Sequence, residues 1–105
     1  MSYRTFYVTT KNETEALKIA ETLVNERLVA CANLIPGMKS IYRWHGRLEH
    51  NQETILLLKT KDSEAEKVVA RISELHSYTV PCIVSWEIKE ANQKYLRWID
   101  SEIGK

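Results

Sequence analysis

The spacing of apolar positions changes along the chain, and each change marks the boundary of a predicted element. Aromatic and β-branched residues are concentrated in residues 3–10, which is typical of a strand. After this segment, Asn12 and Glu15 form a capping-box-like pattern that predicts the start of a helix. The helix is expected to bury one apolar stripe, made of Ala16, Leu17, Ala20, Leu23, Val24 and Leu28.

The middle of the chain predicts a long hairpin. Residues 29–35 form a nearly continuous apolar run, which indicates a strand covered on both faces. Pro36 and Gly37 predict a bulge or bend, and alternation resumes over residues 40–44. The next two residues, 45–46, are the best turn candidate because the second is glycine, which tolerates positive φ. A second strand is then expected over residues 48–60.

The last third of the chain predicts a helix, a strand and a final helix. Ser63 and Glu66 form a second capping-box pattern, so a helix is expected to begin there. A loop over residues 76–81 leads to a strand over residues 82–88, and residues 91–103 form the last helix. The inward side of the middle helix is predicted to comprise Ala65, Val68, Val69, Ile72 and Leu75.

The resulting order, β-α-β-β-α-β-α, predicts an α+β fold. It is the ferredoxin-like βαββαβ sandwich with an extra C-terminal helix, and the length of 105 residues fits a single domain over residues 1–105. The right-handed crossover rule places the first and third strands centrally, with both main helices on one face of the sheet. The other face and the long hairpin favour an oligomer in which sheets or hairpin arms pair between chains.

Composition and charge exclude several classes of function. The formal net charge is +1 and the pI is near 7.8, so no strong field favours nucleic acid or an anionic membrane surface. The longest apolar stretches are too short for a membrane span. Two cysteines make no disulfide framework, and without an export signal we expect reduced thiols and a cytoplasmic protein.

The catalytic motifs of common enzyme classes are missing from the sequence. There is no G-x-S-x-G nucleophile motif and no glycine loop that could cradle a phosphate, and the chain has three glycines in total. Acylphosphatases share the fold class, but the loop after the first strand, residues 9–12, has neither glycine nor arginine to hold an anion. We therefore expect a binding protein rather than an enzyme.

Four segments resemble a known family. They are ACANLIPG over residues 30–37, SIYRWHG over residues 40–46, HSYTVP over residues 76–81 and NQKYLRWI over residues 92–99. In this order and spacing they resemble the divalent-cation tolerance proteins of the CutA family. The resemblance implies a ferredoxin-like fold in a tight homotrimer, similar in architecture to PII signalling proteins. It also implies a link to tolerance of copper and other divalent cations, with no cofactor required.

The chain departs from the family pattern at a few positions. Ser77 stands where the family usually has proline after the histidine, and Cys82 stands where an acidic residue is common. Some members carry a cysteine and a second histidine at the positions of Val8 and Leu75. The metal site proposed for those members is therefore matched here only by His76.

Cys31 and His76 are the candidate metal ligands. Cys31 lies in an apolar strand, where it is either a small buried thiol or a soft ligand for Cu(I) near a subunit interface. His76 ends the middle helix, where it either caps the last carbonyls or binds copper or zinc with ligands from elsewhere. Cys82 follows a proline at the start of a strand, where a passive role competes with metal binding.

Aromatic residues define a second candidate site. Tyr42 and Trp44 share one strand face with Ser40 and suit either an oligomer interface or a ligand cleft between subunits. The leading hypothesis is a homotrimer that binds copper or another divalent metal. The alternatives are a PII-like sensor of a small metabolite and a scaffold that displays a surface to a protein partner. In the sensor hypothesis, recognition depends on Arg43, Trp44, Glu53, Lys59 and Tyr78.

Overall fold

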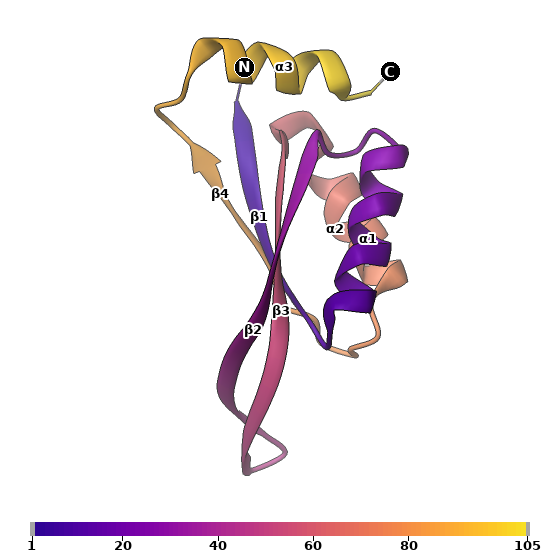
Figure 1. Ribbon diagram of the computed structural model, residues 1–105, viewed down its shortest axis with the longest axis vertical. Helices are drawn as coiled ribbons and strands as arrows, with labels where there is room; N and C mark the ends of the chain where they lie inside the picture. The colour runs from indigo at the N-terminus through magenta and orange to yellow at the C-terminus, as the bar shows by residue number, and fades with distance from the viewer. Residues whose placement is uncertain (1, 105) are drawn as a thin grey trace.

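The computed structural model describes residues 2–104 of the chain (Figure 1). Within that range a four-stranded antiparallel sheet is combined with three α-helices and one short 3-10 helix, Asp62–Glu64. No helix in the same range is both long and apolar enough to cross a membrane. The strands and α-helices are β1 (Tyr3–Thr10), α1 (Glu13–Asn25), β2 (Cys31–Trp44), β3 (Arg47–Lys61), α2 (Ala65–Leu75), β4 (Ile83–Ile88) and α3 (Gln93–Glu102).

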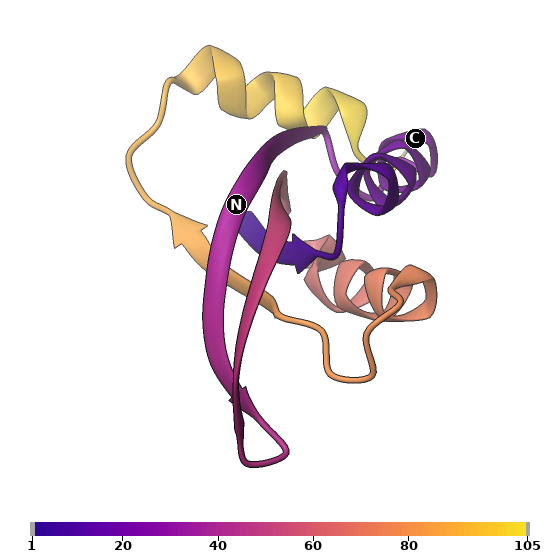
Figure 2. The same ribbon diagram turned by 60° about the horizontal axis from the view of Figure 1, so that its bottom comes forward.

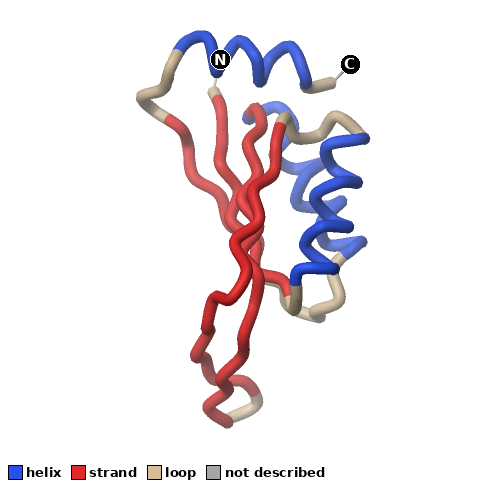
Figure 3. The backbone as a smooth tube through the Cα atoms, viewed as in Figure 1, coloured by secondary structure: helices blue, strands red, loops and turns tan. Residues whose placement is uncertain are grey.

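The strand order β2-β3-β1-β4 confirms the predicted ferredoxin-like topology. β1 and β3 are central, and every neighbouring pair of strands is antiparallel. α1 and α2 lie together on one side of the sheet, while α3 crosses its upper end (Figures 1 and 3). The α+β fold with an extra C-terminal helix is therefore the one that the element order predicts.

The alternation of β1 separates the two faces of the sheet. Phe6 and Val8 point toward α1 and α2 and are buried with apolar residues of both helices. Tyr7 and Thr9 point to the opposite face, because successive side chains of a strand alternate. The main core therefore lies between the sheet and the two helices. It comprises Phe6, Val8, Ile19, Ala20, Leu23, Val29, Leu56, Leu58, Val68 and Ile72.

The face of the sheet opposite α1 and α2, called here the open face, is covered mainly at one end. There Ile99 of α3 packs with Tyr3 and Ala30 in a second buried cluster. Farther from α3 the open face is apolar and accessible, since Val84 and Trp86 of β4 are 49% and 50% exposed. The monomer therefore presents an apolar sheet surface that its own helices leave uncovered.

β2 and β3 extend beyond the rest of the sheet as a two-stranded arm (Figures 1 and 2). The molecule measures 45 × 26 × 22 Å, and the arm makes it elongated. His45 and Gly46 both have positive φ, 51° and 77°, as a two-residue type I′ hairpin turn requires. The predicted bulge is also confirmed, because the register shifts between Ile35 and Met38, around Pro36 and Gly37.

Two helix predictions need correction. α1 is capped as predicted, since the Asn12 side chain accepts the Glu15 backbone N–H at 2.9 Å. The second capping box is wrong, because the 3-10 helix precedes α2 and its N-cap, Glu64, makes no side-chain capping bond. The predicted apolar stripes are too wide: Leu17, Val24 and Val69 are exposed on the outer sides of the helices. A helix packed on a sheet buries a narrower arc than the sequence suggests.

The predicted burial of the second strand is also wrong for the single chain. Residues 29–30 are buried before β2 begins, but Asn33 and Ile35 within β2 are exposed. β2 is an edge strand whose outer side has no neighbouring strand within residues 2–104. Ala32 and Leu34 of the run pack against the main core, so within this chain the run is covered on one face only.

Candidate ligand-binding site

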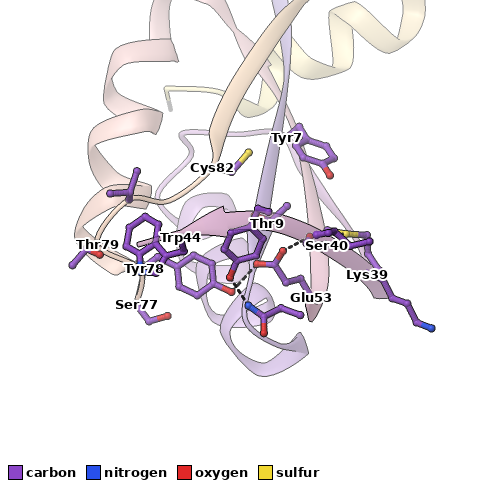
Figure 4. Close-up of a pocket in the computed structure, with 15 residues that line it drawn as sticks. Tyr7, Thr9, Lys39, Ser40, Trp44, Glu53, Ser77, Tyr78, Thr79 and Cys82 are labelled. Atoms are coloured by element: carbon purple, nitrogen blue, oxygen red, sulfur yellow. Dashed lines mark hydrogen bonds between the residues drawn. The ribbon is translucent and has the colours of Figure 1, made fainter. Parts of the chain in front are cut away.

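A cavity of about 840 Å³ lies on the open face, where the hairpin arm meets β1, the start of β4 and the loop after α2 (Figure 4). This volume is ordinary for a small-molecule site. Tyrosine and tryptophan rings contribute much of its wall. The lining residues are Tyr7, Thr9, Met38, Lys39, Ser40, Ile41, Tyr42, Trp44, Asn51, Glu53, Ser77, Tyr78, Thr79, Val80 and Cys82.

The β-bulge decides which side chains of the arm reach this cavity. Ile35 pairs with Ile55, and after the bulge Met38 pairs with Glu53, so β2 carries one extra residue between the two pairs. Because directly paired residues share a face, the extra residue moves the even-numbered positions of β2 onto the open face. Ser40, Tyr42 and Trp44 therefore face the cavity.

Glu53 of β3 forms the polar floor of the cavity. Its side chain is only 5% exposed. One carboxylate oxygen accepts a hydrogen bond from the Ser40 hydroxyl, and the other accepts one from the Tyr78 hydroxyl at 2.7 Å. Beside this group, the Asn51 amide donates to the Tyr42 hydroxyl. Figure 4 shows Ser40 and Tyr78 reaching Glu53 from opposite sides of the cavity.

The negative charge of Glu53 also affects two neighbouring groups. Burial raises the pKa of Tyr78, and the hydrogen bond to Glu53 raises it further. Burial likewise raises the pKa of the Cys82 thiol, with the Glu53 charge as the second cause. Both groups therefore stay protonated at neutral pH, and Cys82 is a poor nucleophile in this setting.

His76 holds the loop that carries Tyr78. Its Nε2 lies 2.8 Å from the Thr9 carbonyl oxygen, so Nε2 carries the proton and donates. Its Nδ1 accepts the backbone N–H of Tyr78 at 3.1 Å. The ring is buried, and both of its nitrogens are engaged. A metal ion at His76 has to displace one of these hydrogen bonds.

Cys31, the other candidate metal ligand, lies far from His76. Its sulfur lies 3.3 Å from the Tyr95 hydroxyl of α3, and burial together with Cys31 raises the pKa of Tyr95 to about 12. Cys31 pairs with Lys59, which in turn pairs with Thr5 of β1, whereas His76 contacts Thr9 of the same strand. Cys31 and His76 are therefore separated by about 13 Å in the direction of β1 alone. Within residues 2–104, no three His, Cys, Asp or Glu side chains gather closely enough to hold a metal.

The predicted cleft residues are brought together only in part. Trp44, Glu53 and Tyr78 line the cavity, which one chain forms by itself, whereas the predicted cleft lies between subunits. Arg43 does not, because strand alternation places it on the opposite side of the arm. Lys59 lies beside Cys31 at the other end of the sheet, where its ammonium donates to the Asn33 side chain at 2.8 Å.

The sequence analysis did not name several of the residues that line the cavity. Tyr7 and Thr9 lie on the open face of β1, and alternation within that strand could have identified them. Asn51 could have been found by extending the alternation of β3 from Glu53. Cys82 reaches the cavity through a contact between distant segments, which periodicity does not encode.

These features define a class: a ferredoxin-like α+β sandwich whose open sheet face carries an aromatic cleft of ligand size. A family model described as "CutA1 divalent ion tolerance protein" matches residues 4–102 of the chain. The chain belongs to the CutA1 divalent ion tolerance protein family, which confirms the resemblance found in its motifs.

Relatives support this assignment at the levels of sequence and structure. The divalent-cation tolerance protein CutA of Thermus thermophilus is 45% identical over 97 residues, which cover 92% of this chain and 94% of that protein. The solved CutA structure from Xylella fastidiosa is 34% identical, with a TM-score of 0.95 and coverage of 98% of this chain and 99% of that one. A chloroplastic CutA of Arabidopsis thaliana is 36% identical over 89% of this chain, which spans 51% of that protein.

The raised pKa of Tyr78 predicts a late step in an alkaline titration. Because the folded-state pKa lies above the ordinary value of about 10, the stabilisation from this tyrosine is present below pH 10 and is lost as the pH rises above it. We expect ultraviolet phenolate absorbance to show a step above pH 10 that Tyr78→Phe removes. Glu53→Gln should lower the pH of this step without abolishing it, since burial is the larger cause.

Tyr95→Phe provides the control for this titration. Tyr95 also has a raised pKa, but its causes are burial and Cys31, far from Glu53. Its late step should therefore be unaffected by Glu53→Gln. If Glu53→Gln leaves the Tyr78 step at the same pH, the hydrogen-bonded arrangement at Glu53 is wrong.

Proposed function

We propose that this protein acts in divalent-cation tolerance by binding a metal ion rather than by catalysis. In this proposal it is a homotrimer, and copper is the first metal to consider. The observation that carries the proposal is the family match across residues 4–102, supported by the close Thermus relative that is named for the same role.

An uncovered sheet favours self-association. β2 and β4 form opposite edges of the sheet, and the open face carries half-exposed Ile35, Val84 and Trp86. Exposed edge strands and a contiguous apolar face are aggregation hazards unless another chain covers them. A partner copy that pairs along an edge and covers the part of this face around Val84 and Trp86 removes both hazards at once.

The two edges also bear on the number of subunits. Pairing of the β2 edge of one copy with the β4 edge of the next is a heterologous, head-to-tail contact. Such a contact closes into a ring when the rotation between neighbouring copies allows it, and otherwise it produces an open filament. A ring of three copies is one closed arrangement of this contact, and we propose it because the family resemblance implies a homotrimer.

A metal site in this protein is expected to draw on more than one subunit. The Cys31 thiol is a soft ligand that suits Cu(I), and imidazole also suits copper. Since Cys31 and His76 lie apart in one chain, each can contribute only to a site completed by a neighbouring copy. Binding at His76 must also release the backbone N–H of Tyr78 or the Thr9 carbonyl.

A second candidate function is recognition of a small molecule in the aromatic cavity, as in a PII-like sensor. The observation that favours it is the buried Glu53 carboxylate, which lies in a cavity of about 840 Å³ beside the rings of Trp44 and Tyr78. The two functions are compatible, because the cavity and the Cys31 region lie at different places on the sheet.

We place both functions in the cytoplasm. Cys31 and Cys82 are free thiols, which persist in a reducing compartment. The Arabidopsis relative is named chloroplastic, so location varies among relatives. Recovery of the protein outside the cytoplasmic fraction of its own cells would contradict this placement.

The trimer is tested by mass in solution. Light scattering should give three times the chain mass of 12.2 kDa. Val84→Glu places a charge on the open face and should shift the mass toward that of the monomer. Val69→Glu on the outer side of α2 is a matched control, because Val69 has a similar exposure of 40% and should leave the trimer intact. A monomeric native protein would refute the trimer proposal, and equal effects of both variants would refute the open face as its interface.

Metal binding is tested by calorimetry with copper and zinc. We expect saturable copper binding at a fixed ratio to the trimer, and loss of that binding in Cys31→Ser. His76→Gln is the second variant, because glutamine can still donate toward Thr9 and accept from Tyr78 while lacking the imidazole. Binding that is weak, non-stoichiometric and unchanged in both variants argues against these ligands and leaves the cavity as the functional site.

A further inference from the structure

Glu53 is a buried carboxylate without a cationic partner in its own chain. It is 5% exposed, and among residues 2–104 no lysine, arginine or histidine forms an ion pair with it. Its two partners, Ser40 and Tyr78, are neutral hydroxyl donors. Burial of a carboxylate is costly unless the charge is compensated. The floor of the cavity therefore favours a positive charge.

Glu53 also retains capacity to accept hydrogen bonds. An ionised carboxylate can accept about four hydrogen bonds, and Glu53 accepts one at each oxygen. The nearest lysine on the wall, Lys39, extends away from Glu53 in Figure 4. The remaining lone pairs are therefore available to N–H donors of a molecule in the cavity.

The walls around this charge are aromatic. Tyr7, Tyr42, Trp44 and Tyr78 all line the cavity. The negative π faces of such rings attract cations, tryptophan most strongly, and they also pack against a flat apolar body. A carboxylate together with several aromatic rings is a combination that recognises an organic cation.

The same features disfavour other ligands. A hard divalent cation needs several oxygen ligands, and within residues 2–104 no group of three metal-ligating side chains is present. An anion, including a nucleotide phosphate, would lie against the Glu53 charge without a basic side chain directed toward it. A neutral ligand leaves the buried charge uncompensated.

We propose that this cavity binds a small organic cation that carries N–H donors, such as a primary amine or a guanidinium group. The cationic group lies against Glu53, and the apolar body of the ligand lies among Tyr42, Trp44 and Tyr78. This proposal rests on the second candidate function, recognition of a small molecule in the cavity. It specifies the chemical class of that molecule, and its test uses no metal.

The test compares three probes of nearly equal shape on the native protein. Phenethylamine is the cation, 2-phenylethanol is the neutral analogue and 3-phenylpropionate is the anion. We expect phenethylamine alone to bind saturably, with one site per chain by calorimetry and a concentration-dependent rise in melting temperature. In Glu53→Gln the affinity should fall roughly tenfold or more, since hydrogen bonds to charged groups are the strong ones.

Two matched variants separate recognition from folding. Glu87→Gln makes the same substitution at an exposed position of β4 outside the cavity, and it should leave phenethylamine binding unchanged. Trp44→Leu removes one aromatic wall and should weaken phenethylamine binding while Glu53 is intact. Light scattering on each variant checks that the assembly of the native protein is retained.

Three outcomes overturn the proposal. Equal binding of all three probes, unaffected by Glu53→Gln, shows a cavity without charge selectivity, so the second candidate function survives and the cation class fails. No binding of phenethylamine to the native assembly rejects the organic cation. If Glu53→Gln also changes the mass in solution, Glu53 takes part in the contact between copies and is not the group that holds a ligand. None of these outcomes affects the copper titration.

Discussion

The strict alternation of β1 at the centre of the sheet is the constraint on which the rest of the structure depends. β1 pairs with both β3 and β4, so its register fixes which side chains of three strands point to each face. Phe6 and Val8 are buried under α1 and α2. The same alternation leaves Tyr7 and Thr9 on the open face, where a ligand or another subunit can reach them. A shift of one residue in β1 would exchange these two roles.

The bulge in β2 adds a second constraint that acts only on the arm. Before the bulge, odd-numbered residues of β2 share the open face, and after it even-numbered residues do. This change of parity brings Ser40 to the Glu53 carboxylate and directs Trp44 toward the cavity. Without the bulge, the same side chains of the arm would lie on the opposite face of the sheet, away from Glu53.

The cavity and the family's link to divalent cations indicate different functional residues in this chain. Tolerance of divalent cations suggests soft or imidazole ligands, yet Cys31 and His76 are each engaged locally and lie apart. The cavity is better organised, because His76 fixes the loop that carries Tyr78, and Tyr78 in turn donates to Glu53. In a single chain, His76 thus acts as a positioning residue for the cavity. A metal at His76 would disturb the cavity, so the two activities, if both are present, are coupled.

The sequence by itself determined the order of elements, the topology and the family. These features depend on local signals, namely alternation in residues 3–10, helical spacing after Asn12 and the turn at His45 and Gly46. The sequence also singled out Trp44, Glu53 and Tyr78 as candidate cleft residues, and these three line the cavity. The alternation and the helical spacing are observed in the structure because the backbone geometry of strands and helices sets these two periods.

Only the tertiary structure decided which candidates meet. Arg43 and Lys59 were excluded from the cavity by strand alternation and by register, which depend on the pairing partner. The separation of Cys31 from His76 and the dual hydrogen bonding of the imidazole likewise arise from contacts between segments distant in sequence. The physical reason is that burial and charge compensation depend on the whole environment of a group. A glutamate side chain has the same intrinsic chemistry at any position, but only the fold of this chain buries Glu53 among aromatic rings.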